Sequence, residues 1–149
     1  MEARETTRSG CETIQNQIVQ ECKQHPEIAA VFLFGSYGTC YQTKFSDIDL
    51  GVLFSPDCVP DLKGEMRLAG SFCKATGRDD VDLVVLNKAP LPLRYRIVVE
   101  GQLIYEQDYV CTSDFLATTY TLFLDYNIDY RKFMDEYRQS LKEAYTNNG

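Results

Sequence analysis

FLFGSYGTCYQTKFSDIDLGVLF, residues 32–54, carries two apolar runs on either side of a polar loop. The loop begins with Gly35 and Ser36 and ends at Asp47 and Asp49, which are one residue apart. Short apolar runs bounded by glycine and polar residues predict two buried strands. The open question is why two like charges stand at the entrance of a strand that otherwise belongs to the core.

Helical and strand patterns alternate along the rest of the chain. Helices are predicted over residues 10–24, 60–76 and 93–100, and strands over residues 28–34, 48–54, 79–87 and 102–106. About a dozen residues join the first two strands, which is enough for a short helix or an open loop. This order predicts an α/β (α+β) fold in which a small mixed sheet is flanked by helices.

The C-terminal part, residues 112–146, has aromatic and aliphatic residues at helical spacing, and Ser113 and Asp114 can cap the helix. One helix over this span is long for so small a domain, so we expect a break near residues 127–129 or a packed partner along it. Plain core packing would explain the aromatic residues, but the tyrosines exceed what a small core needs and suit a partner surface.

Composition narrows the function classes. The chain has 149 residues and a net charge of −7, which suits one domain and argues against a broad phosphate-binding surface, so we expect no direct contact with nucleic acid. The six cysteines form no CxxC motif, which disfavours zinc. No apolar run reaches the length of a membrane span or a signal peptide, so we predict a cytoplasmic protein with no membrane contact.

The two aspartates predict a cation site. Residues i and i+2 of a strand point to the same face about 6.5–7 Å apart, so Asp47 and Asp49 would repel each other unless a cation lies between them. Mg²⁺ prefers such oxygen ligands and leaves room for substrate phosphates. Asp82 is the best third carboxylate, because it opens a strand that could pair beside residues 48–54. Asp79 and Asp80 are interpreted as solvated turn residues.

The glycine and serine fit the same chemistry. Gly35 at a strand end lets the backbone approach a phosphate, and the turn that follows offers N–H groups and the Ser36 hydroxyl. Taken alone, a Gly-Ser turn or an exposed Asp-x-Asp is common without any ligand. The argument rests on their conjunction, GS-x10-DxD followed by an acidic residue opening a third strand.

This arrangement resembles the catalytic signature of the nucleotidyltransferases of the DNA polymerase β superfamily. The LN-x-AP-x-x-L section at residues 86–93, the EG-x-x-IYE section at residues 100–106 and the tyrosine-rich C-terminal helix further resemble the minimal nucleotidyltransferases, the antitoxin half of MntA/HepT toxin–antitoxin pairs. The resemblance implies a nucleotidyltransferase fold over residues 1–149, with a catalytic core at 10–110 and a C-terminal partner surface.

The resemblance also implies roles for single residues. Gly35 and Ser36 would contact the nucleotide phosphates, and Asp47, Asp49 and Asp82 would hold Mg²⁺, with Asp82 as the general base. Many members have an arginine after Gly-Ser, whereas this chain has tyrosine there, so Lys44 is a candidate to supply the cation for the triphosphate, against the simpler interpretation of an exposed loop lysine.

The implied reaction is transfer of AMP from ATP to a tyrosine hydroxyl of a partner, a HepT-like HEPN toxin, which silences the toxin. One alternative is an antitoxin that binds and occludes the toxin without catalysis. Another is transfer to a small molecule, for which the chain has only its C-terminal helical segment to spare. Homo-oligomers and hetero-oligomers with the toxin are both compatible with the sequence.

Overall fold

The structure is a computed structural model, and it describes residues 2–35 and 47–147. The elements of these residues follow the order predicted from the sequence, with one short 3-10 helix added. They are α1 (Glu2–Cys22), β1 (Ile28–Phe34), β2 (Ile48–Phe54), η1 (Pro56–Cys58), α2 (Leu62–Thr76), β3 (Val81–Val85), α3 (Leu91–Glu100), β4 (Gln102–Glu106) and α4 (Tyr109–Asn147).

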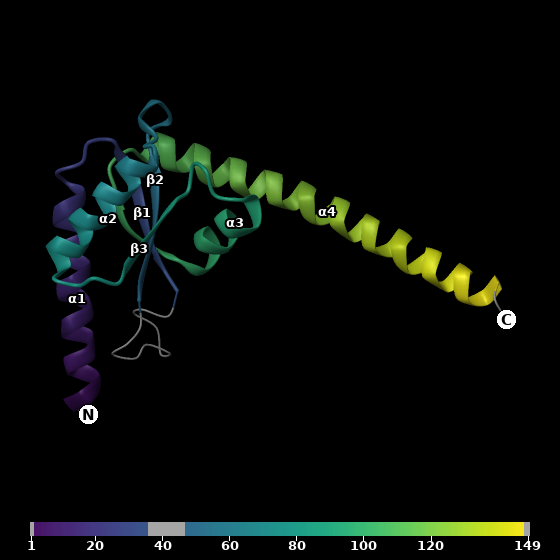
Figure 1. Ribbon diagram of the computed structural model, residues 1–149, viewed down its shortest axis with the longest axis horizontal. Helices are drawn as coiled ribbons and strands as arrows, with labels where there is room; N and C mark the ends of the chain where they lie inside the picture. The colour runs from purple at the N-terminus through teal and green to yellow at the C-terminus, as the bar shows by residue number, and fades with distance from the viewer. Residues whose placement is uncertain (1, 36–46, 148–149) are drawn as a thin grey trace.

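The four described strands form one mixed sheet in the order β3-β2-β1-β4 (Figure 1). β1 pairs antiparallel with both β2 and β4, and β2 pairs parallel with β3. The side chain of Asn87 continues the hydrogen bonding of the sheet beyond β3. Its Oδ1 accepts a hydrogen bond from the N–H of Phe54 at 2.9 Å, and its Nδ2 donates one to the C=O of Phe54 at 3.0 Å. The predicted mixed sheet flanked by helices is confirmed.

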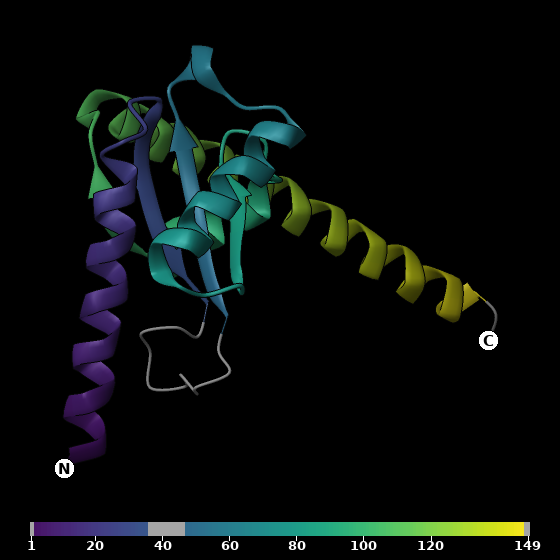
Figure 2. The ribbon, with the colours of Figure 1, turned by 60° about the vertical axis from the view of Figure 1, so that its left-hand side comes forward.

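Each face of the sheet is covered by two helices (Figure 2). Alternate residues of β1 and β2, such as Val31 and Leu50, pack with Ile18 of α1 and Phe72 of α2 in one core. The intervening residues pack on the other face in a second core with α3 and α4, whose members include Phe32, Leu53, Leu86 and Ile97. This two-sided burial explains why the strands read as nearly continuous apolar runs.

The ends of α2 follow from local chemistry. Asp61 caps the first turn by accepting a hydrogen bond from the N–H of Gly64 at 2.8 Å. Gly77 ends the helix in the left-handed region, at φ +70°, and the N–H of Arg78 returns to the carbonyl of Cys73. The predicted helix over residues 60–76 and its terminal glycine are therefore confirmed.

The C-terminal helix corrects two expectations. α4 begins at Tyr109, and its cap is Asp108, which accepts a hydrogen bond from the N–H of Cys111 at 3.1 Å, so the predicted Ser113 and Asp114 cap is wrong. The predicted break near residues 127–129 is also wrong, because α4 is continuous over 39 residues. Its sequence holds no glycine or proline to interrupt the backbone bonds. No helix in the described ranges, α4 included, has the length and apolarity to cross a membrane.

Gly51 of β2 lies directly beneath Ile97 of α3. A Cβ at Gly51 would lie 3.0 Å from Ile97 Cγ2 and 3.2 Å from Leu86 Cδ2, whereas a Cβ at Gly70 of α2 would have open space around it. We therefore expect Gly51→Ala to overpack the core and destabilise the protein by about 1–3 kcal/mol. Gly70→Ala is the matched control, expected to stabilise by about 0.5–1 kcal/mol. Urea unfolding of both variants checks this, and an unchanged Gly51→Ala variant would contradict the packing.

Candidate functional site

Asp49 and Asp82 lie side by side on two neighbouring strands, β2 and β3. The parallel register of β2 and β3 pairs Asp49 with Asp82, so both side chains point to the same face of the sheet. That face is the one covered by α3 and α4, because Asp49 alternates with the buried Ile48 and Leu50 of the opposite core. The prediction that Asp82 opens a strand beside residues 48–54 is confirmed.

The end of the sheet leaves these carboxylates accessible. α3 covers the same face as far as Gly51, which is two residues from Asp49 along β2. Asp49 is half-buried and Asp82 is exposed, although the residues on either side of Asp49 are fully buried. The polar groups therefore stand where the apolar cover of the sheet ends, which is a position that a solvent-borne ligand can reach.

The carboxylates act on one another. Burial raises the pKa of Asp49 above its ordinary value, and the negative charges of Asp82 and Asp47 raise it further. Asp47 is exposed and lies one residue before β2, whose bounds are those of the strand predicted from the sequence. The three acids nevertheless share one electrostatic site at this end of the sheet.

Carboxylate oxygens are the donors that hard cations prefer, and three mutually repelling carboxylates fit a divalent cation chemically. As they stand, however, the described side chains include no group of three Asp, Glu, His or Cys residues that could hold a metal ion by itself. The assignment of Asp47, Asp49 and Asp82 as metal ligands therefore stays a prediction.

The contact with Asp49 restricts position 35 to glycine. The φ of Gly35 is +81°, in the left-handed region that favours glycine. A Cβ at this position would lie 3.3 Å from the Asp49 Cγ and closer still to Oδ2. Register explains the contact, because Phe34, the residue before Gly35, pairs with Asp49 across β1 and β2. The backbone at the end of β1 can approach the carboxylate only because the residue is glycine.

Two predicted residues, Ser36 and Lys44, lie outside the described residues. A neighbouring interaction went unnoticed in the sequence: Arg78 donates hydrogen bonds of 2.7 and 2.5 Å to the two carboxylate oxygens of Asp80. These bonds hold the pKa of Asp80 below its ordinary value, so Asp80 is an ion-paired residue and not simply a solvated one. The two residues are two apart across a turn, a spacing that could have suggested the pair.

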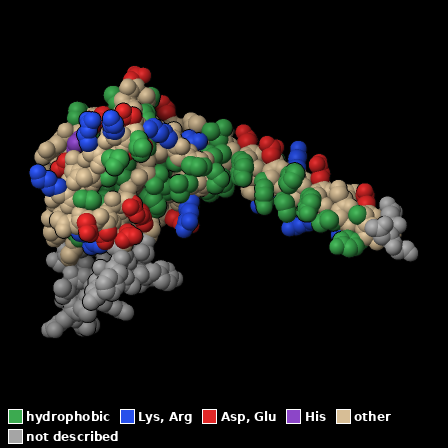
Figure 3. All heavy atoms as spheres, in the orientation of Figure 1, with side chains coloured by type: hydrophobic (Ala, Val, Ile, Leu, Met, Phe, Trp, Pro, Cys, Tyr) green, Lys and Arg blue, Asp and Glu red, His purple; other side chains and the backbone are tan. Residues whose placement is uncertain are grey.

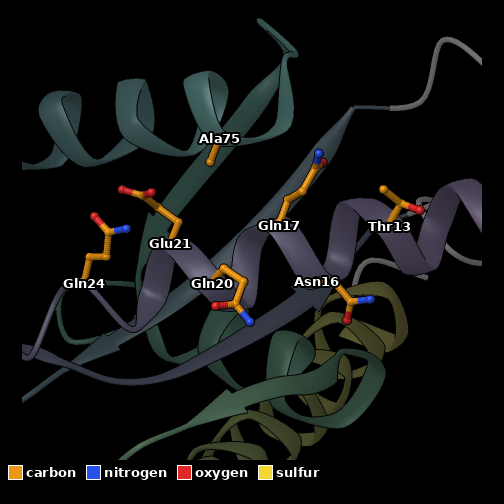
Figure 4. A pocket seen from close by; sticks show the side chains of 7 residues that line it. All are labelled: Thr13, Asn16, Gln17, Gln20, Glu21, Gln24 and Ala75. Carbon is orange, nitrogen blue, oxygen red and sulfur yellow. The ribbon is translucent and has the colours of Figure 1, made fainter.

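Two hollows lie elsewhere on the described surface. One, of about 390 Å³, is lined mainly by polar side chains of α1 with Ala75 of α2 (Figure 4). Its one carboxylate, Glu21, is within 3.0 Å of His25 Nε2. The other, of about 460 Å³, lies at Phe54, the opposite end of β2 from Asp49. Neither hollow holds the clustered carboxylates, so the acidic end of the sheet remains the candidate site.

Comparison with known proteins places this geometry in a family. The model of the polymerase beta nucleotidyltransferase family matches residues 16–110, which span the whole sheet and the three acids. The chain belongs to this family. Membership confirms the nucleotidyltransferase fold predicted from the GS-x10-DxD arrangement.

The chain is 33% identical over 89 residues, or 59% of its length, to the protein adenylyltransferase MntA of Shewanella oneidensis, and it spans 62% of that relative. A solved toxin–antitoxin structure with AMP-PNP contains a similar chain, at 26% identity and a TM-score of 0.68, covering 82% of this chain and 96% of that one. A complex of a tri-AMPylated Shewanella oneidensis HEPN toxin with its MNT antitoxin shares the fold, at 23% identity and a TM-score of 0.65, covering 85% and 97%.

Asp49→Asn should stabilise the protein at neutral pH. Because the pKa of Asp49 is higher in the folded state than in the unfolded chain, ionisation of this carboxyl costs folding free energy as the pH rises through that pKa. The variant should therefore have the higher Tm at pH 7–8, and the difference should shrink as the pH falls. Asp79→Asn, in the exposed turn before β3, controls for the loss of one charge. A lower Tm for Asp49→Asn at neutral pH would contradict the repulsion.

Gly35→Ala should be destabilising for two separable reasons. The positive φ costs about 1–2 kcal/mol for an alanine, and the added Cβ collides with the Asp49 carboxylate. A double-mutant cycle with Asp49→Ala separates the two, since removal of the carboxylate relieves the collision and leaves the backbone strain. Chemical denaturation measures the four proteins. Strict additivity would contradict the contact between Gly35 and Asp49.

Proposed function

We propose that this protein transfers AMP from ATP to a tyrosine hydroxyl of a partner HEPN-type toxin and so neutralises it as an antitoxin. The observation that carries the proposal is the placement of Asp49 beside Asp82 on paired strands, with Gly35 packed against Asp49. The name of the curated relative, a protein adenylyltransferase, and the AMP-PNP in the similar toxin–antitoxin structure support the same reaction for this chain.

In the proposed reaction the tyrosine oxygen attacks the α-phosphorus of ATP. The new bond joins that oxygen to phosphorus, the bond between the α-phosphorus and the bridging oxygen breaks, and pyrophosphate leaves. Asp82 accepts the hydroxyl proton as general base. Its exposed carboxylate on β3 suits this role, because the acceptor tyrosine approaches from solvent on another molecule.

Asp47, Asp49 and Asp82 would hold Mg²⁺ together with the phosphates. When bound, the cation would neutralise negative charge on the triphosphate and on the phosphoryl group being transferred. The raised pKa of Asp49 is the observation that supports this assignment, since a carboxylate crowded by two others gains most from a neighbouring positive charge.

The end of β1 would receive the triphosphate. The left-handed backbone at Gly35 leaves no side chain between the strand end and the Asp49 carboxylate, so phosphate oxygens can come close to both. Ser36 adds a hydroxyl, and Lys44 stands in for the arginine found after Gly-Ser in many members. We place this reaction in the cytoplasm, where ATP and Mg²⁺ are abundant.

The C-terminal helix would hold the partner. α4 carries large apolar side chains that are more than 40% exposed, among them Tyr126, Tyr130 and Phe133. A surface of this kind marks a site of protein interaction. It supports residues 112–146 as the partner surface, with residues 10–110 as the catalytic core. A transferase that acts on small molecules would not need an exposed apolar surface of this kind.

Labelled ATP tests the proposal. With Mg²⁺ and the HEPN partner, the wild-type protein should transfer label from α-³²P-ATP to the partner, and Asp47→Asn and Asp82→Asn should each lose at least about a hundredfold in rate, as expected for removal of groups that act on the transferring phosphoryl. Asp79→Asn, three residues before Asp82 and exposed, should keep the wild-type rate. Chelation of the divalent cation with EDTA should abolish transfer.

Neutralisation by occlusion is the alternative that the exposed α4 surface favours. In that case a double Asp47→Asn, Asp49→Asn variant would still rescue growth of cells that produce the toxin. Loss of rescue together with loss of label transfer supports the enzymatic antitoxin. Transfer by the wild-type chain that stays unchanged in Asp47→Asn would contradict the proposed site.

A further inference from the structure

The long helix α4 consists of two halves with different surroundings. Its first half, to about residue 123, packs against α3 and β1, and its buried residues there include Thr112 and Thr119. Its second half, residues 124–147, extends away from the domain in both ribbon views (Figures 1 and 2). Nothing in the described chain covers this second half.

One face of α4 runs through both halves. At 100° per residue, the buried Thr112 and Thr119 project in the same direction as a set of exposed residues further along. This set, called here the α4 stripe, is Tyr126, Tyr130, Phe133, Tyr137 and Leu141. Each is between 41% and 64% exposed. The face that docks α4 on its own domain therefore continues, still apolar, beyond the domain.

Aromatic contacts join the stripe to the folded core. Tyr95 of α3 stacks on Phe123 with ring centroids 3.6 Å apart. The ring centroids of Phe123 and Tyr126 are 6.2 Å apart, and those of Tyr126 and Tyr130 are 6.3 Å apart. A partner on the stripe would thus extend a packing layer that α3 begins.

The two edges of the stripe carry opposite charge. On the helical wheel, Asp129, Glu136 and Glu143 lie about 100° to one side of it, with Lys132 behind them at about 135°. Arg131, Arg138 and Lys142 lie about 120° to the other side. In Figure 3 the apolar side chains of α4 form a row, with acidic side chains along the upper edge and most basic ones along the lower. This separation of charge gives the surface a defined polarity for any helix that packs on it.

A second copy of the chain fits this surface poorly in either direction. An antiparallel pair related by a two-fold axis sets equal edges together, so that Glu136 faces its own equivalent and Asp129 faces Glu143. A parallel pair matches the charges, but it places the second helix along the first half of α4, where α3 and β1 already pack. Charge opposes one arrangement and steric exclusion the other.

We propose that the α4 stripe binds an amphipathic helix of the HEPN toxin, with a basic edge of that helix against Asp129, Glu136 and Glu143 and an acidic edge against Arg131, Arg138 and Lys142. The inference rests on the proposed function for the class of partner. It adds the surface, the shape of the element bound and the polarity of its charges, and it excludes self-association through the stripe.

Two matched pairs of variants test the surface. Phe133→Ser removes a stripe residue that is 64% exposed, and Ile128→Ser removes a residue that is 54% exposed on the opposite face of α4. Glu136→Lys reverses a charge at the acidic edge, and Asp135→Lys makes the same change one residue away on the back of the helix. Since all four side chains are exposed or face solvent, these variants should fold like the wild type, which circular dichroism verifies.

Binding of each full-length variant to the HEPN-domain protein from the same genome is measured by calorimetry without ATP, so no AMP transfer takes place. We expect Phe133→Ser and Glu136→Lys to weaken binding at least tenfold, as buried aromatic and charge-paired interface positions do, and both controls to stay within twofold of the wild type. Light scattering of the wild-type chain alone should report a monomer.

Three results would each overturn the inference. They are absence of binding by the wild-type chain, equal losses of affinity in the variants and their controls, and a wild-type dimer that Phe133→Ser dissociates. The readout is independent of catalysis. Should AMP transfer fail while the stripe variants lose binding and the controls keep it, the proposed enzymatic function fails and the docking surface stands.

Discussion

The structure depends on the parallel pairing of β2 with β3. This pairing sets Asp49 and Asp82 abreast on one face of the sheet, and Asp47 adds a third negative charge just before β2. Besides burial, the negative charges of Asp82 and Asp47 raise the pKa of Asp49 and oppose folding. The packing of the rest of the sheet keeps the three carboxylates close despite this repulsion. The apolar residues of the two cores provide the opposing free energy.

Glycine at two positions makes that arrangement possible. Gly51 allows α3 to lie directly on β2, which seals the α3 side of the sheet up to the edge of the acidic site. Gly35 lets the end of β1 come against the Asp49 carboxylate, with a backbone conformation that other residues adopt only with strain. The same face of the sheet is thus a packed core at its centre and an open polar site at its end.

The long C-terminal helix gives the small domain a second surface. The first half of α4 is held by the domain, while its second half presents apolar side chains to solvent. The proposed catalytic residues and the proposed partner surface therefore lie on separate elements. The acidic cluster is in the sheet, within the family match at residues 16–110, and the proposed docking surface is on the helix that continues beyond it.

The sequence by itself determined the element order and the GS-x10-DxD arrangement, because strand periodicity, glycine and paired carboxylates are local signals. That arrangement carried the resemblance to the family. The sequence also indicated Asp82, from the acidic residue that opens a short apolar run. Only the tertiary structure decided the parallel register of Asp49 with Asp82 and the contact of Gly35 with Asp49. Both depend on which strands become neighbours in the sheet, and no local pattern along the chain encodes that choice.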